Sequence, residues 1–313
     1  MATTDEEFME AWMRGECSPA KVARILNIDV RNVYKRRGNL SQKGVVLPTT
    51  VRKQSDNPYG QTWSYKRERE GYVENGHVIV YSDAHFWPGE RTVANEALLL
   101  LLKELKPKRV IANGDIFDGA KVSRHDPHGW GQPPSVREEL DACRDRQHEI
   151  VMAAPKGCEF DWNIGNHDMR FDKTLAIHAG QYDGVIERLC DHFPEWNMAW
   201  SIRLNRNVMI KHRWHNGIHA TYNNALKGGL TIVTGHLHRL AVTPWANYTG
   251  RIWGVDSGTL SDPLGPQFEY LENNSTPWCS GFAVLTFKDG MILPPELCEV
   301  IEGHAYFRGK LVV

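Results

Sequence analysis

Five short clusters of acidic, histidine and asparagine residues recur along the chain, each after a run rich in β-prone residues. In order they are Asp83-x-His85, Gly114-Asp115-x-x-Asp118, Gly165-Asn166-His167-Asp168, His212 and Gly235-His236-x-His238. Hard oxygen donors and imidazole nitrogens suit manganese, iron or zinc, whereas a ligand set without cysteine disfavours a structural zinc site. The clusters therefore predict a site for divalent cations with a chemical role.

The run before Asp115 shows how such a cluster could be positioned. Residues 109–113 form a short, largely apolar run that stops at Gly114, which predicts a buried strand delivering Asp115 to a crevice. Strand-like and helix-like segments alternate around it, which predicts right-handed crossovers and a largely parallel sheet. The expected elements are strands at 77–81 and 159–164, helices at 91–106 and up to about residue 153, and a hairpin turning at Asn75-Gly76.

The second half of the chain is rich in strand-like runs. We expect a hairpin around 205–207, a helix at 217–227 and a strand at 230–234. Alternating runs at 240–245, 251–256, 281–288 and 291–300 predict further strands, which we expect in a second sheet. A segment rich in proline, glycine and asparagine at 262–278 separates two of these runs and predicts a loop.

In order and type, the five clusters resemble those of the calcineurin-like metallophosphoesterase superfamily, over roughly residues 77–300. The resemblance implies an α/β fold, a β-sandwich flanked by helices in αββα layers. It also implies two divalent metal ions, Mn2+ first, with Fe, Zn, Ni or Mg as alternatives. Carried over by residue, it assigns Asp83, His85, Asp115 and His238 to one ion and Asp115, Asn166, His212 and His236 to the other.

The resemblance also implies catalytic roles for two residues of these clusters. His167 is the non-ligand histidine of its block and would face the leaving group. Asp118 would hold and polarise it, as a carboxylate does for a catalytic imidazole. Asp168 is expected to cap the next helix, and Gly114, Gly165 and Gly235 to permit tight turns at the strand ends.

The fourth cluster leaves a choice between neighbouring histidines. His212 is preferred as the ligand because it comes first after the β-rich run 208–210, and His215 is the alternative. His219 would lie on the following helix and could help to bind phosphate. Arg124 and His125, in the loop after Asp115, are further candidates for phosphate contacts.

The sequence of residues 4–38 predicts three short helices that resemble a helix-turn-helix. Thr4 and Glu7 form a capping box at the start of the first helix, and the third helix is expected to end at Gly38. The third helix should turn Val30, Val33 and Tyr34 inward. Its basic residues Arg31, Lys35, Arg36 and Arg37 suit a nucleic-acid backbone, although a docking or dimerisation module remains an equal alternative. The expected organisation is a helical segment at 1–40, a linker at 41–62 and the metallophosphoesterase domain at 63–313.

Length and composition narrow the class of protein. The 313 residues carry a formal charge of -1 and no apolar run long enough for a membrane span, which predicts a cytoplasmic protein without a membrane partner. Scattered cysteines predict reduced thiols.

The resemblance is to phage or prophage members, which implies the cytoplasm of an infected or lysogenic bacterial host. It predicts a two-metal phosphodiesterase acting on nucleic acid or nucleotides, such as a nuclease, through a water activated to hydroxide. Gly119-Ala120 replaces the Arg-Gly that serine/threonine phosphatases of the superfamily carry there. The alternatives are a phosphomonoesterase or cyclic-nucleotide hydrolase, and a DNA-binding or assembly protein that uses the fold as a scaffold.

Overall fold

The computed structural model describes residues 4–15, 19–43, 45, 47, 65–89, 91–125, 132–248 and 250–313. The chain divides into two compact units, Met1–Ser64 and Tyr65–Val313. The linker predicted at 41–62 lies outside the described residues apart from 41–43, 45 and 47. Within the described ranges no helix is both long and apolar enough to cross a membrane, and the five cysteines there are free thiols.

The first unit contains the helices α1 (Asp5–Arg14), α2 (Pro19–Leu26) and α3 (Val30–Gln42). Thr4 and Glu7 form the predicted capping box of α1. Two predictions for α3 are wrong. The helix continues through Gly38, because Leu40 packs into the core at 1% exposure and outweighs the local stop signal. Of the three residues predicted to point inward, only Val33 is buried, while Val30 and Tyr34 are exposed.

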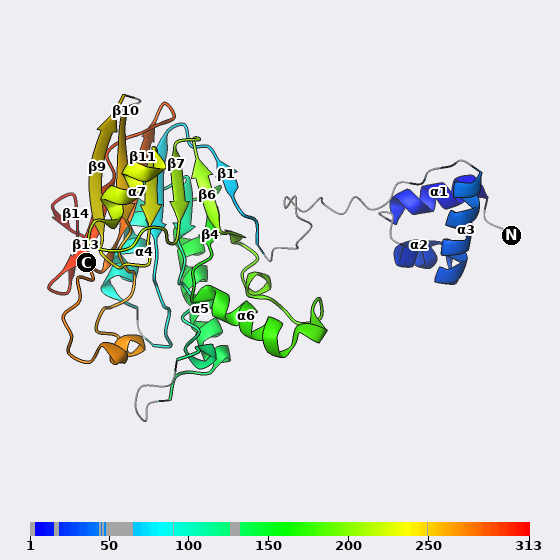
Figure 1. The fold of residues 1–313 in the computed structure, drawn as a ribbon, viewed down its shortest axis with the longest axis horizontal. Helices are drawn as coiled ribbons and strands as arrows, with labels where there is room; N and C mark the ends of the chain where they lie inside the picture. The colour runs from blue at the N-terminus through cyan, green and yellow to red at the C-terminus, as the bar shows by residue number, and fades with distance from the viewer. Residues whose placement is uncertain are drawn as a thin grey trace. The chain divides into compact units, whose positions relative to one another are not determined.

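The second unit is built on two sheets, described here for residues 65–313 with their gaps (Figure 1). The first sheet has the strand order β15 (Lys310–Leu311), β14 (His304–Phe307), β13 (Glu296–Ile301), β11 (Gly281–Lys288), β2 (Gly76–Tyr81), β3 (Arg109–Ala112), β4 (Glu159–Asn163), β5 (Asn197–Ala199). In addition, β12 (Met291–Ile292) pairs with β11. The second follows β1 (Arg69–Gly71), β6 (Ser201–Leu204), β7 (Val208–Lys211), β8 (Thr231–Thr234), β10 (Gly250–Asp256), β9 (Ala241–Asn247). Strands β2 to β5 are parallel to one another, as are β7, β8 and β10.

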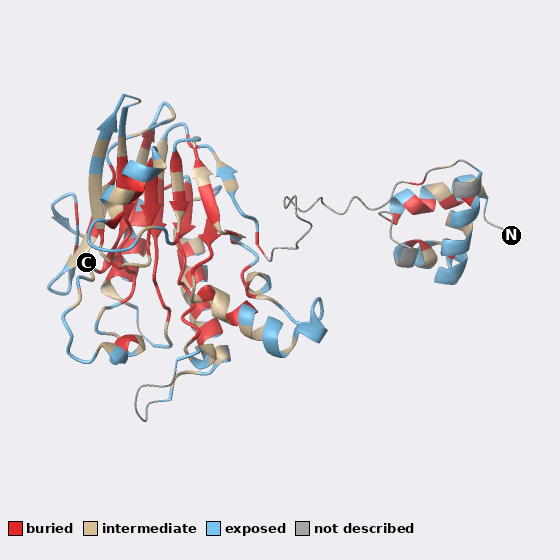
Figure 2. Ribbon diagram, in the orientation of Figure 1, coloured by how far each residue is buried: buried red, intermediate tan, exposed pale blue. Residues whose placement is uncertain are grey.

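The main core lies between the two sheets and follows the alternation of each strand. In β2, Val78 and Val80 point to the other sheet, where they join Ile210 and Val233, and Ile79 belongs to the helical side. Helix α4 (Val93–Leu105) packs against β11, β13 and β14 and against α5 (Val136–Ala153). Helix α7 (Ala220–Gly228) packs against β8, β9 and β10. The predicted αββα sandwich is therefore confirmed, with burial concentrated in the strands (Figure 2).

Two details of the predicted strand pairing are wrong. Asn75-Gly76 does not turn a hairpin, because the strands on its two sides belong to different sheets. Strand β1 pairs with β6 in the second sheet, whereas β2 pairs with β11 in the first. Asn75 instead accepts a hydrogen bond from the backbone of Asp289 at 2.9 Å. The late strands do not share one sheet either, since β9 and β10 extend the second sheet and β11 to β13 pair beside β2 in the first. Local turn and strand signals do not identify which strand becomes the partner.

Candidate metal centre

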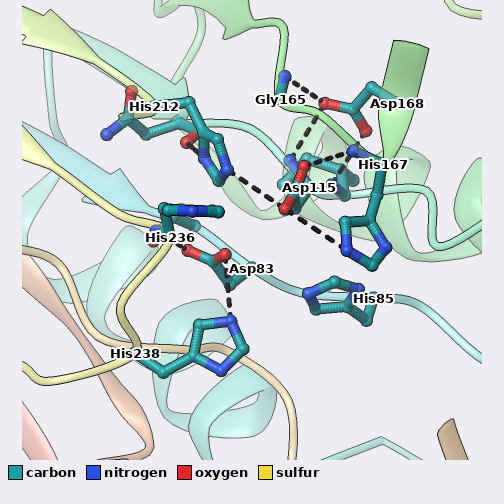
Figure 3. Close-up of polar contacts among 12 residues, drawn as sticks. Asp83, His85, Asp115, Gly165, His167, Asp168, His212, His236 and His238 are labelled. Carbon is teal, nitrogen blue, oxygen red and sulfur yellow. Dashed lines mark hydrogen bonds and ion pairs between the residues drawn. The ribbon is translucent and has the colours of Figure 1, made fainter. Parts of the chain in front are cut away.

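The five clusters meet where strands of both sheets end. Those after β2, β3 and β4 come from the first sheet, and those after β7 and β8 come from the second. Parallel neighbouring strands place their carboxyl ends at one edge, so side chains that are distant in sequence converge there. Figure 3 shows Asp83 and Asp115 at the middle of this convergence, with the histidines around them.

Seven of these residues form three overlapping groups whose potential ligand atoms lie within 4.8 Å of one another. The groups are Asp83, His85 and His238; His85, Asp115 and His167; and Asp115, His212 and His236. Asp83 Oδ1 lies 3.0 Å from His238 Nε2, and Asp115 Oδ2 lies 3.1 Å from His212 Nε2. Asp115 belongs to two groups and so connects the two halves of the cluster.

Hydrogen bonds fix which nitrogen of two histidines faces the cluster. His212 Nδ1 lies 2.8 Å from the Asn113 carbonyl, which can only accept, so Nδ1 carries the hydrogen. His85 Nδ1 donates in the same way to Asp118 Oδ1 at 2.8 Å. Among the described residues, His85 Nε2 and Asn166 Oδ1 are buried without a hydrogen-bond partner, and His212 Nε2 faces Asp115 Oδ2. Imidazoles oriented by an outer partner, with the other nitrogen facing the cluster, fit a metal site.

The backbone at this edge adopts conformations that are uncommon for residues other than glycine. Asp83, His85, Asp115, His236 and His238 have φ values of 51°, 40°, 52°, 72° and 58°. Such conformations cost on the order of 1–3 kcal/mol each and concentrate at functional sites. The turns therefore aim side chains inward at a cost that other contacts must offset.

Asp168 supplies many of those contacts. It does not cap the next helix as predicted, because His167 is the N-cap of α6 (Asp168–His178) and Asp168 is the first helical residue. Its Oδ2 accepts from the backbone N–H of Asp115 at 3.0 Å and of Gly165 at 2.8 Å, and from Trp162 Nε1 at 3.0 Å. Its Oδ1 accepts from the next two amides of the second cluster, both at 3.0 Å. This buried carboxylate therefore ties the second cluster to the third, as Figure 3 shows in part.

The three glycines of the clusters are required by close approach more than by turn geometry. Only Gly114 has a positive φ, 88°, and a Cβ there would lie 2.5 Å from the His212 ring. A Cβ at Gly165 would meet Asp115 Oδ1 at 2.1 Å, and one at Gly235 would lie 2.6 Å from Asp83 Oδ2. Any larger residue would displace a side chain of the cluster.

The charges of the cluster favour bound cations. Burial alone would raise the pKa of Asp115, but the neighbouring imidazoles, His212 first, hold it well below its usual range. Burial lowers the pKa of His212, yet Asp115 and Asp83 outweigh this and raise it to about 10. Two buried, ionised carboxylates therefore lie close together, and positive charge stabilises them.

His167 lies at the edge of the cluster with two partners. Its Nδ1 lies 2.9 Å from Asp118 Oδ1, the same oxygen that accepts from His85. Arg170 Nη2 lies 3.1 Å from His167 Nε2, and Arg170 Nη1 donates to the Asp118 carbonyl at 2.9 Å. Sequence reasoning missed Arg170, although a basic residue one helical turn after the motif histidine was a usable signal.

Other candidates lie apart from the cluster. The groups with metal-ligand geometry in the described ranges include His212 and not His215, whose ring packs on Trp214 at 4.6 Å. His219 is exposed and directly precedes α7. In the described ranges no contact joins the exposed residues Arg124 and His125 to the cluster, and the His125 amide donates to Ser123 Oγ at 3.1 Å.

A two-sheet sandwich flanked by helices, with carboxylate, imidazole and amide side chains gathered where strands of both sheets end, is the arrangement expected from the resemblance to calcineurin-like metallophosphoesterases. The chain has this fold. No protein-family model matches it. It is 22% identical over 262 residues to the Gene 54 protein of Mycobacterium phage L5, covering 75% of this chain and 97% of that protein. The Gene 54 protein of Mycobacterium phage D29 is 23% identical over 250 residues, covering 72% and 94%.

Two solved structures illustrate the range of similar proteins. Vps29 of Entamoeba histolytica, crystallised with zinc, is 12% identical with a TM-score of 0.41, covering 76% of this chain and 99% of that one. An archaeal phosphodiesterase is 13% identical with a TM-score of 0.36, covering 72% and 99%. The sequence relatives are phage proteins, which agrees with the expected phage-type resemblance.

Proposed function

We propose that the chain is a hydrolase that uses two divalent metal ions to cleave phosphodiesters of nucleic acid or nucleotides. The main support for this proposal is that Asp115 belongs to two groups of potential metal ligands. One of these groups also contains His85, and the other also contains His212 and His236. Asp83 and His238 complete the first site, and Asn166 adds an oxygen to the second. When bound, such a pair polarises phosphoryl oxygens and lowers the pKa of water, and manganese suits this donor set.

His167 is the proposed proton donor to the leaving oxygen. Burial lowers its pKa, but the hydrogen bond to Asp118 and the charge of Asp115 outweigh burial and raise it. The Arg170 guanidinium lies against Nε2, the atom that would carry the proton. We propose that Arg170 turns to the anionic phosphate when substrate binds, which frees Nε2 to hold and deliver a proton.

The first unit supports a nucleic-acid substrate through part of the predicted basic set. Arg31 and Lys35 on α3 are exposed, beside the exposed ring of Tyr34. Arg36 pairs with Asp5 at 3.2 Å, and Arg37 lies over the Trp12 ring at 5.3 Å. We therefore propose Arg31 and Lys35 as phosphate contacts and assign the other two arginines mainly to the packing of this unit.

The experiment compares bis-p-nitrophenyl phosphate with p-nitrophenyl phosphate, and adds single- and double-stranded DNA, all with manganese. The proposal expects turnover of the diester and of DNA by the wild type, and loss of both in Asp115→Asn. Asp141→Asn is a matched control, because Asp141 is an exposed carboxylate on α5. Preference for the monoester would favour a phosphomonoesterase, and equal activity of Asp115→Asn would contradict the metal centre.

A further inference from the structure

Three aromatic side chains, Phe268, Tyr270 and Trp278, lie along one side of the metal centre, and we call them the aromatic shelf. The first two belong to the short helix η4 (Pro266–Leu271). Phe268 is 4% exposed, and its ring centroid lies 5.3 Å from that of His85 and 5.9 Å from that of His238. The shelf therefore packs directly on two imidazoles of the proposed first metal site.

Trp278 continues this wall from the end of the same loop. Its ring centroid lies 4.3 Å from that of His238, edge to face, and 5.0 Å from that of Phe268. The side chain is only partly buried. Two ring contacts hold the indole in place while part of its surface stays accessible, which suits a rigid contact for a flat ligand.

Tyr270 adds an exposed ring to the shelf. It is 56% exposed, and its ring centroid lies 6.4 Å from that of Phe268. Burial and the charge of Asp118 raise the pKa of its phenol, with Arg170 acting in the opposite direction. An exposed aromatic ring contributes little to the core, so its position needs another reason.

A nucleobase fits this arrangement better than a second phosphate does. The shelf presents aromatic rings and no cation, while the cations proposed for phosphate are the metal pair and Arg170. Bases stack on aromatic side chains whatever their sequence, because every base has a π face.

We infer that Tyr270 and Trp278 stack a nucleobase of the scissile diester, so that the site prefers nucleoside-bearing diesters. This inference rests on the proposed phosphodiesterase function and adds the substrate group that the same site would recognise. Stacking of this kind corresponds to about 5- to 100-fold in binding.

The test uses the full chain with manganese and two esters that release the same leaving group. Thymidine 5'-(p-nitrophenyl phosphate) carries a nucleoside where methyl p-nitrophenyl phosphate carries a methyl group. The wild type should have the lower KM for the thymidine ester. Tyr270→Ala should raise that KM about 5- to 100-fold and leave kcat/KM for the methyl ester within about twofold. Tyr270→Phe, which keeps the ring, should behave as the wild type.

A control and two outcomes make the result decisive. Leu264→Ala changes a residue of the same loop that is 93% exposed, and it should affect neither ester. Equal effects of Tyr270→Ala on both esters, or no effect on either, would overturn the shelf. If the wild type hydrolyses neither ester, the proposed function fails. The affinity for the intact thymidine ester, measured by equilibrium dialysis, then tests the shelf separately. Equal affinity of the wild type and Tyr270→Ala would overturn the shelf.

Discussion

Replacing Asp168 with asparagine tests how the turns of the metal centre are held. The carboxylate accepts hydrogen bonds at both oxygens, and its side chain is fully buried. Asparagine has nearly the same shape, but one oxygen becomes an NH2 group that donates. Whichever way the amide turns, N–H groups of the surrounding backbone then face another donor.

The structure gives the size of this effect. The less damaging orientation keeps the oxygen that accepts three hydrogen bonds and loses the one that accepts from Ile116 N and Phe117 N, each at 3.0 Å. Hydrogen bonds to a charged group contribute about 1.5–3 kcal/mol each, so two of them amount to about 3–6 kcal/mol. That is a large part of the ~5–15 kcal/mol that stabilises a typical domain.

Urea unfolding followed by tryptophan fluorescence at 25 °C measures this loss. Asp168→Asn should lower the free energy of unfolding by about 3–6 kcal/mol and lower metal content, because the Asp115 turn loses its anchor. Asp141→Asn removes an exposed helical pair with Arg144 and should change stability by less than about 0.5 kcal/mol. If Asp168→Asn loses less than about 1 kcal/mol and keeps its metals, this account of the turns is refuted.

Three further predictions concern the site and the first unit. Gly165→Ala should lower turnover of a diester about 100-fold, because the added Cβ would lie 2.1 Å from Asp115 Oδ1. Gly180→Ala is the control, because a Cβ there meets open space, and it should leave turnover unchanged. Equal turnover by the two variants would contradict this prediction. His167→Ala should slow the hydrolysis of diesters with poor alkoxide leaving groups about 100- to 10,000-fold, because such leaving groups need a proton. The hydrolysis of p-nitrophenyl esters should slow much less. An equal loss of rate for both kinds of ester would exclude His167 as the proton donor. Substituting Arg31 and Lys35 together by alanine should reduce the slope of log affinity for duplex DNA against log salt by about 2; an unchanged slope in fluorescence anisotropy would remove them from the interface.

Parallel strands end at a common edge, which explains why the clusters after β2, β3 and β4 converge, and likewise those after β7 and β8. That the two sets belong to one site was implied only by the family resemblance. The choice between His212 and His215 did not follow from the sequence, since residue spacing does not show which ring reaches the cluster. The structure favours His212 through two neighbours, the Asn113 carbonyl that orients the ring and the side-chain-free Gly114 against which it packs. Its role as a ligand remains a proposal.

Contacts to the backbone were the main features hidden from the sequence. The sequence predicts Asp168 as a helix cap and not as a backbone anchor, because its amide donors carry no side-chain signature. The turn at Asn75-Gly76 read as a hairpin for a similar reason, since strand propensity is local while the partner strand is chosen by the whole sandwich. Shared edges of parallel strands are thus easier to predict than individual pairings.

The bridging position of Asp115 is tested most directly by counting metal ions per chain. Wild type, Asp115→Ala and His238→Ala would each be loaded with manganese, desalted and measured by inductively coupled plasma mass spectrometry. Because Asp115 belongs to two of the three ligand groups and His238 to one, we expect two ions in the wild type, close to none in Asp115→Ala and about one in His238→Ala. Two ions retained by Asp115→Ala, or fewer than two in the wild type, would contradict the two-metal centre.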